Sequence, residues 1–157
     1  MSKQPLEIPG SVWKALMVEL KRLGEGRRET GAFLLSRVGS RTVTECICYN
    51  ELDPSAFDTG IIVFHGSGLV QLWNHCAAEG LEVVADIHTH PGSWTGQSEL
   101  DRTHPMICET GHIALIVPMF AGRRNQTLKR VGIFEYLGEH RWKNWTANSG
   151  KVKVVRK

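Results

Sequence analysis

The stretch that decides the fold is LEVVADIHTHPGSWTGQSELD, from Leu81 to Asp101. Its first half is apolar and rich in valine, which predicts a strand in the interior of a sheet. His88 and His90 lie two residues apart at the end of this strand, so their side chains point to the same face and can converge on one ion. Pro91 cannot donate a hydrogen bond to a sheet, and we expect the strand to end there.

A loop with two glycines follows the histidines and leads to Ser98. Ser98 is a good N-cap for a short helix, and Asp101 falls one turn into that helix. Taken alone, a Ser-x-x-Asp sequence usually caps a helix, and a His-x-His pair usually has no function. Together they predict a zinc site with the three ligands His88, His90 and Asp101, because catalytic zinc takes three protein ligands and keeps one position for water.

Hydrophobic periodicity predicts the elements around this stretch. We expect helices over residues 11–23 and 67–79, strands over 30–36, 42–50, 61–64 and 112–118, a loop over 51–60 and a hairpin over 131–145. The predicted fold class is therefore α/β, with one mixed domain in which helices flank a central sheet. We assign residues 1–146 to this domain and expect residues 147–157 to form a flexible basic tail.

Composition narrows the function classes. The 157 residues suit one domain with its own core. No apolar run approaches the ~20 residues that span a bilayer, and the N-terminus lacks a signal-peptide pattern, so we expect a cytoplasmic protein without a membrane partner. The net charge of +3 comes partly from basic clusters, which we interpret as solvated loops. Contact with an acidic partner is the alternative, and no aromatic-interleaved basic motif supports nucleic acid.

The four cysteines form no C-x-x-C pair, and without a secretion signal we expect them to be reduced and structural.

The segment HTHPGSWTGQSELD resembles the JAMM motif of the JAB/MPN metallopeptidases, in which His-x-His is followed by seven residues and Ser-x-x-Asp. That family also has a glutamate upstream, on the strand after the first helix, and ETGAFLLS begins here at Glu29. The resemblance runs from about residue 10 to residue 137. It implies a curved central sheet flanked by helices, a fold similar to that of cytidine deaminases, and one catalytic Zn²⁺.

The resemblance also implies roles by position. Glu29 resembles the glutamate that activates the attacking water, and Ser98 resembles the serine that stabilises the oxyanion. Without the motif, Glu29 would be interpreted as a surface residue paired with Arg27 or Arg28. In the loop beside the ligands, three residues are expected to bind substrate: Trp94, Thr95 and Gly96. For the tryptophan, packing beneath the loop is an equal alternative.

The activity implied by the resemblance is zinc-dependent cleavage of the amide bond after the C-terminal glycine of a ubiquitin-like protein, as deconjugation or precursor processing. The compact chain is similar to stand-alone prokaryotic members, some of which act in ubiquitin-like conjugation or antiphage defence. The expected partners are the ubiquitin-like protein or its conjugate, with E1-like and E2-like proteins of the same pathway.

Two alternatives to this activity are processing of a sulfur-carrier protein in cofactor or cysteine synthesis, and a non-catalytic MPN-type binding module. Two further classes of zinc enzyme lack their sequence patterns here. A zinc deaminase would need His-x-Glu with Pro-Cys-x-x-Cys, and a zincin would need His-Glu-x-x-His; the sequence contains neither pattern.

Overall fold

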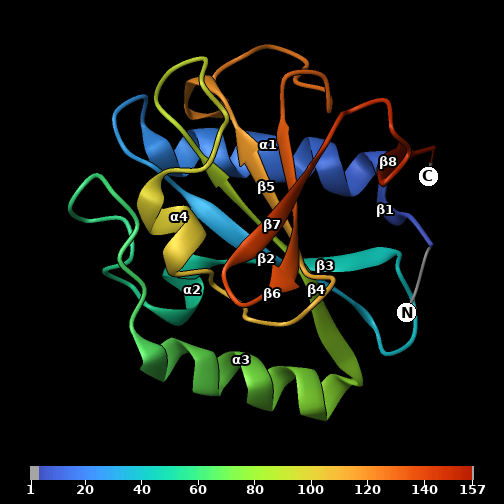
Figure 1. Cartoon of the computed structure of the whole chain (residues 1–157). Helices are drawn as coiled ribbons and strands as arrows, with labels where there is room; N and C mark the ends of the chain where they lie inside the picture. The colour runs from blue at the N-terminus through green and yellow to red at the C-terminus, as the bar shows by residue number, and fades with distance from the viewer. Residues whose placement is uncertain (1–3, 157) are drawn as a thin grey trace.

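In the computed structural model, which describes residues 4–156, a six-stranded sheet has the order β3-β2-β4-β5-β6-β7 (Figure 1). The central strand β4 (Leu81–Thr89) pairs in parallel with β5 (Ile113–Val117) and antiparallel with β2 (Gly31–Arg37). The outer strands are antiparallel to their neighbours: β3 (Val43–Cys48), β6 (Gly132–Gly138) and β7 (Arg141–Trp145). The predicted mixed α/β domain is therefore confirmed.

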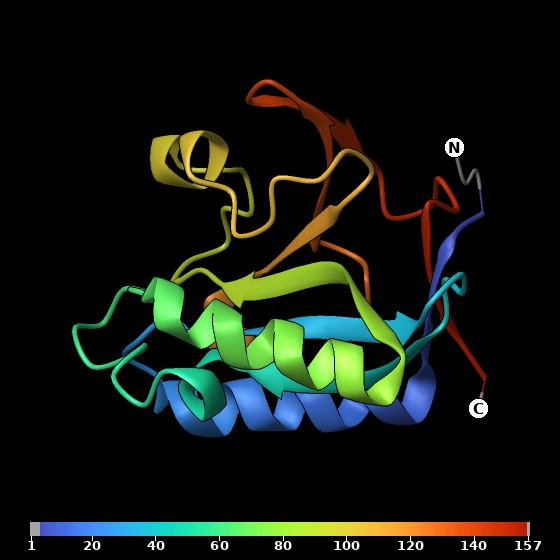
Figure 2. The ribbon, with the colours of Figure 1, turned by 90° about the horizontal axis from the view of Figure 1, so that it is seen from below.

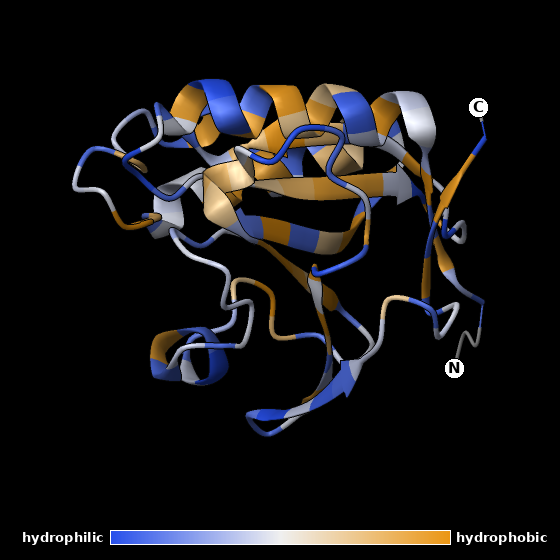
Figure 3. Ribbon diagram, turned by 90° about the horizontal axis from the view of Figure 1, so that it is seen from above, coloured by the Kyte–Doolittle hydropathy of each residue, from blue (hydrophilic) through white to orange (hydrophobic). Residues whose placement is uncertain are grey.

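Helices cover both faces of the sheet (Figure 2). α1 (Gly10–Gly24) packs on one face with Leu34, Ile87 and Leu115 of the sheet, and α3 (Gly66–Glu79) packs on the other. In Figure 3 the hydrophobic colour is concentrated on the strands between these layers, whereas the tip of the β6–β7 hairpin is hydrophilic. No helix within residues 4–156 is long and apolar enough to cross a lipid bilayer.

Three short helices lie in the connections that follow β3, β4 and β5. They are α2 (Tyr49–Leu52), α4 (Glu99–Thr103) and the 3-10 turn η1 (Met119–Ala121). α4 lies away from the main layers, on the side of the β6–β7 hairpin (Figure 2). The indole Nε1 of Trp142 on β7 donates to the Arg102 carbonyl at 3.1 Å and links the hairpin to α4.

Two local expectations were wrong, and the first helix begins one residue earlier than expected. Pro9 stands at the N-cap of α1, and no side chain caps this end. Tyr49 and Asn50 leave the predicted strand and begin α2. Residues 61–64 form no strand, because no neighbouring strand pairs with them and two of their side chains, Ile61 and Val63, are exposed.

The expected flexible tail is also wrong for its central part. β8 (Val152–Val155) pairs in parallel with β1 (Leu6–Pro9), and the two strands form a small second sheet. Val152 is 2 % exposed and belongs to the core on the α1 face, because the alternating valines of KVKVV give the segment one apolar side. The segment is therefore part of the fold. Lys157 lies outside the described residues.

Candidate metal centre

The three predicted metal ligands meet at the end of β4. His88 and His90 project from the same side of the strand, and Asp101 reaches them from the first turn of α4. The Nε2 atoms of the two histidines are 3.2 Å apart, and Asp101 Oδ2 lies 3.5 Å from the first and 3.4 Å from the second. These residues form a group that could hold a metal ion.

The spacing of the ligand atoms suits zinc. In a tetrahedral zinc site with bonds of about 2.0–2.1 Å, neighbouring ligand atoms are about 3.3 Å apart. The three observed separations of 3.2, 3.4 and 3.5 Å lie close to that value. Two imidazoles and a carboxylate are also a ligand set of catalytic zinc, since they leave the fourth position for water or substrate.

Trp94 fixes the orientation of His90. The Nδ1 atom of His90 lies 3.1 Å from the Trp94 carbonyl oxygen. A carbonyl can only accept, so Nδ1 carries the hydrogen and Nε2 presents its lone pair to the ligand group. The indole also stacks on the imidazole, with ring centroids 5.4 Å apart and an interplanar angle of 22°. The hydrogen bond selects the tautomer that a metal ligand needs, and the stacking holds the ring in place.

A capping box fixes Asp101. Ser98 is the N-cap of α4, and its Oγ accepts from the Asp101 N–H at 3.1 Å. In return, Asp101 Oδ2 accepts from the Ser98 N–H at 2.9 Å. The predicted cap is confirmed. Asp101 Oδ2 accepts the Ser98 N–H and also faces the two histidines. The start of α4 therefore positions the third predicted ligand.

The charges at this point favour a cation. Burial alone would raise the pKa of Asp101, but its contacts with His88 and His90 outweigh burial and hold this pKa well below its usual range. Burial alone would lower the pKa of His90, but its contacts with Asp101 and Trp94 raise it overall. An anionic carboxylate beside an imidazole whose pKa is raised marks a site that stabilises positive charge.

Glu29 faces the same group from the segment before β2. Its backbone N–H donates to the Gly60 carbonyl at 2.8 Å. Burial raises the pKa of its carboxyl, and this outweighs the opposite effect of the nearby His88 and His90. Within residues 4–156, its carboxylate makes no hydrogen bond or ion pair.

The alternative interpretation of Glu29 as a surface ion-pair residue does not describe the structure. Arg27 and Arg28 both pair with Glu25, at 2.9 and 3.0 Å. Glu29 is therefore an unpaired, half-buried carboxyl beside the predicted metal ligands.

The loop after His90 is packed tightly but leaves Trp94 in reach of solvent. The Trp94 side chain is 61 % exposed, although one face of the ring stacks on His90. A Cβ on Gly96 would lie 2.7 Å from the indole, so this position must be glycine for the ring to lie there. The Thr95 carbonyl packs against Gly132 at the start of β6 in the same way.

Sequence patterns did not point to Gly31 or Tyr49. Gly31 is paired with His88 across the β2–β4 ladder, and Tyr49 lies directly over it. A Cβ on Gly31 would be 2.5 Å from the Tyr49 ring and 2.6 Å from the Ile87 carbonyl oxygen. The contact joins β2, α2 and β4, and only the tertiary structure reveals it.

Two other histidines have different places. No sequence pattern distinguishes His112, but its Nε2 lies 2.7 Å from Asp86 Oδ2, and both side chains are buried. Asp86 is two residues before His88 on β4, so this pair lies on the same side of the strand. His104 is exposed, and its Nδ1 lies 2.9 Å from the Thr103 hydroxyl oxygen.

A left-handed turn holds the chain beyond His90. Met119, Phe120 and Ala121 have φ values of 59°, 54° and 58°. The N–H groups of Met119 and Phe120 donate to the carbonyls of Gly92 and His90, at 3.0 and 2.8 Å. For residues other than glycine, such a conformation costs about 1–2 kcal/mol each. These bonds tie the β5–β6 connection to the loop that carries the ligands.

No model of a known protein family matches the chain. Solved structures do match nearly its whole length. A protein from Desulfitobacterium hafniense, determined in solution, is 13 % identical with a TM-score of 0.65, over 96 % of this chain and 93 % of that protein. A protein from Salinibacter ruber, also determined in solution, is 16 % identical with a TM-score of 0.59, over 97 % and 92 %.

A crystal structure from Archaeoglobus fulgidus gives this similarity a fold name. It is described as a JAB1/MPN domain protein and is 14 % identical to the chain, with a TM-score of 0.51. The match covers 98 % of this chain and 100 % of that protein. Together with the mixed sheet flanked by helices, this similarity shows that the chain has an MPN/JAB-like fold.

Proposed function

We propose that the chain is a zinc-dependent hydrolase that cleaves the amide bond after the C-terminal glycine of a ubiquitin-like protein. One observation carries the proposal: an unpaired, half-buried Glu29 carboxyl faces a group of two imidazoles and one carboxylate with tetrahedral spacing. A purely structural metal clip would need four protein ligands and no free carboxyl beside them.

His88, His90 and Asp101 would hold the zinc ion. When bound, zinc supplies a Lewis acid that acidifies water and polarises a carbonyl group. The Glu29 carboxylate takes a proton from the attacking water and delivers it to the leaving amine. Its raised pKa makes the carboxylate a stronger base for the first transfer, and a pKa nearer the working pH suits a group that both takes and gives a proton.

Ser98 supports the growing negative charge on the carbonyl oxygen. Its Oγ accepts from the Asp101 N–H, which leaves its own hydrogen free to donate. The donor is held by the helix start before the reaction begins, so little reorganisation is needed when the charge develops.

The walls of the site support the proposed substrate class. Trp94 covers His90 on one side, and the segment around Gly60, bonded to Glu29, lies on another. Trp94, Thr95 and Gly96 would contact an extended chain. A tail that ends in glycine suits such a site, because a residue without a side chain can lie close to packed backbone.

Two measurements test the proposal. Purified protein is expected to contain about one zinc ion per chain by mass spectrometry of metals. Glu29→Gln is expected to keep the zinc and to slow cleavage of ubiquitin-like proteins with an extension after their last glycine by at least about 100-fold. Glu25→Gln is the matched control, because Glu25 pairs only with surface arginines, and it should retain activity.

Cleavage by metal-free protein would contradict the proposal, and so would full activity of Glu29→Gln. A chain that binds a ubiquitin-like protein with zinc present and cleaves none of them would be a binding module instead. Activity should also fall as pH falls through the histidine range, because protonated imidazole cannot bind zinc.

A further inference from the structure

The connection between β5 and β6 carries a second group of polar side chains. From Met119 to Val131 it contains four basic residues and no acidic one. Arg123, Lys129 and Arg130 line a cavity of about 180 Å³, which we name the basic cavity. None of these three cations forms an ion pair with any residue in the described range 4–156. The cavity therefore concentrates positive charge that the protein itself does not neutralise.

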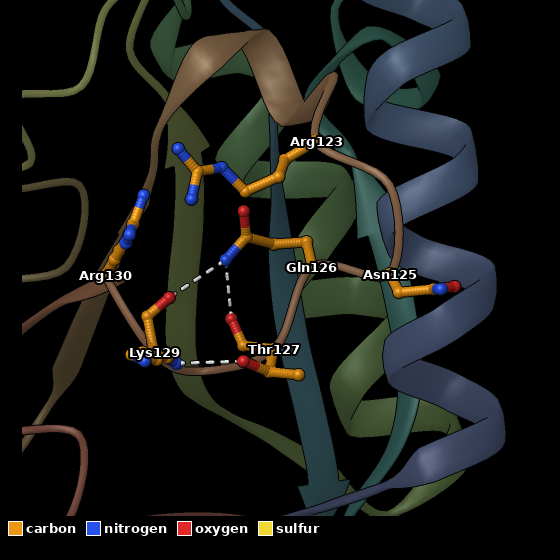
Figure 4. A pocket seen from close by; sticks show the side chains of 6 residues that line it. All are labelled: Arg123, Asn125, Gln126, Thr127, Lys129 and Arg130. Carbon is orange, nitrogen blue, oxygen red and sulfur yellow. Dashed lines mark hydrogen bonds between the residues drawn. The ribbon is translucent and has the colours of Figure 1, made fainter.

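Figure 4 shows how the side chains are arranged. The guanidinium groups of Arg123 and Arg130 lie on the same side of Gln126, whereas the Asn125 side chain points away from them. These two guanidinium groups come from the two ends of the loop, and their N–H groups lie along one wall of the cavity.

Gln126 is a fixed and incompletely bonded residue in this wall. It is 7 % exposed, and its Nε2 donates to the carbonyls of Thr127 and Lys129, at 2.6 and 3.1 Å. These bonds leave Oε1 as a buried acceptor with no partner, directed toward Arg123 in Figure 4. A buried acceptor without a partner is costly, and a donor next to it restores the lost free energy.

The backbone of the loop is held in a definite shape. Trp13 of α1 donates from its indole Nε1 to the Gln126 carbonyl at 2.7 Å. Arg130 has a φ of 72° and Asn125 a φ of 52°, a region that favours glycine. An arginine held in this conformation costs free energy, and such costs are concentrated at functional sites.

We propose that the basic cavity binds the phosphate group of a small ligand. Two planar guanidinium groups and one ammonium group carry three positive charges, which a dianion neutralises better than a monoanion does, and each guanidinium can bind two oxygens of a tetrahedral group. A phosphate dianion leaves one positive charge unneutralised, whereas a carboxylate, with one negative charge and two oxygens, leaves two. When Arg123 turns toward the phosphate, Gln126 Oε1 holds its remaining N–H.

The basic cavity is built from residues other than the metal ligands, so the proposal does not depend on the hydrolase activity. Free phosphate and a phosphate ester share the chemistry that the cavity recognises. The loop is nevertheless joined to the metal centre through the η1 bonds to His90 and Gly92.

Calorimetry with inorganic phosphate at constant ionic strength tests this inference. Arg123→Ala and Arg130→Ala are each expected to weaken phosphate binding by at least about tenfold, because a charged hydrogen-bond pair is lost. Arg124→Ala is the matched control, since this change removes the same charge from the same loop but Arg124 does not line the cavity. Its effect should stay below about twofold.

Further titrations distinguish the free ion from an ester and test binding elsewhere on the protein. Ribose 5-phosphate binding more tightly than phosphate identifies an ester, and the reverse order identifies the free ion; either supports the basic cavity. Equal losses in the Arg124 and Arg123 variants would overturn the proposal, as would equal binding of acetate. Phosphate binding that is lost in Asp101→Asn and kept in Arg123→Ala would place the phosphate on the metal. Much tighter, salt-sensitive binding of single-stranded DNA would assign the loop to nucleic acid instead.

Discussion

His90 Nε2 lies 3.4 Å from Asp101 Oδ2, and that same oxygen accepts the Ser98 N–H at 2.9 Å. The Asp101 carboxylate therefore has two structural relationships at once, one to a helix end and one to the ligand group. A capping residue is fixed by local backbone geometry. A ligand that also caps a helix is held rigidly, without a hydrogen bond to a residue distant in the sequence.

Asp101→Asn separates these two relationships. Asparagine keeps an oxygen for the Ser98 N–H, so we expect α4 to stay capped and the metal-free protein to remain folded, with its melting temperature lowered by the loss of the charged contacts to His88 and His90. It loses the negative charge, so zinc affinity should fall by at least about 100-fold in competition with a chelator. His104→Ala should bind zinc normally, because His104 is exposed and bonds Thr103. If Asp101→Asn binds zinc with normal affinity, Asp101 is not a zinc ligand.

Gly31 and Gly92 make a matched pair of positions near the metal centre. In Gly31→Ala the new methyl group would lie 2.5 Å from the Tyr49 ring and 2.6 Å from a carbonyl oxygen of β4. We expect the free energy of unfolding to fall by about 1–3 kcal/mol. In Gly92→Ala the methyl group would meet no atom within 4 Å. That change should stay within about 0.5 kcal/mol. Urea unfolding of both variants checks the difference.

The features that the sequence predicted correctly are those with local causes. β4 ends at Thr89, two residues before Pro91, and Ser98 caps α4; both features depend on residues a few positions apart. The two histidines share a face because strand periodicity requires it. The glutamate was identified only through the family resemblance, because nothing in the local pattern of RRET distinguishes Glu29 from a surface residue. Its role remains a prediction.

The features that the sequence did not predict depend on distant partners. β8 exists because Val152 pairs with Leu6 at the other end of the described chain. Residues 61–64 have a strand-like composition but no strand to pair with, and only Val63 bonds the backbone, to Ala56. The left-handed turn over Met119, Phe120 and Ala121 contains no glycine, so the sequence does not indicate it.

Trp94→Ala tests whether the exposed indole contacts substrate. The Trp94 carbonyl that orients His90 belongs to the backbone and stays in the variant, so zinc affinity should change by less than about tenfold. If the free face of the ring holds substrate, KM should rise while kcat changes little. Trp73→Ala is the control, because Trp73 is 46 % exposed on α3. Loss of zinc in proportion to activity would instead mean that the indole only supports His90.

The cysteines should differ in reactivity. Burial raises the pKa of both the Cys46 and Cys48 thiols to about 12 and also raises the pKa of Cys76. Cys108 is exposed. At about pH 8, near the ordinary pKa of a thiol, we expect iodoacetamide to add one group per native chain, at Cys108. Intact mass measures the number of adducts. Cys108→Ser should add none, and four adducts on the native protein would contradict the buried positions.

The last prediction concerns the loop beside Glu29. The His65 backbone N–H donates to Asp53 Oδ2 at 3.0 Å, and the His65 ring Nδ1 lies 2.7 Å from the same oxygen. These bonds, with smaller contributions from Ser55, hold the pKa of Asp53 well below its ordinary value of 3.8. They close the loop that contains Gly60, whose carbonyl accepts the Glu29 N–H.

The sign of the pH effect follows from this depressed pKa. An aspartate that is more acidic in the folded state stabilises the fold above its unfolded pKa, and the stabilisation is lost as pH falls toward the folded pKa. The melting temperature of the wild type should therefore drop more steeply between about pH 5 and pH 2 than that of Asp53→Asn. Loss of zinc at low pH affects both proteins, so their difference isolates Asp53. Asp58→Asn is the control, because Asp58 is exposed on the same loop and its carboxylate has no partner within residues 4–156. Parallel pH curves for wild type and Asp53→Asn would show that the His65 contact does not stabilise the loop.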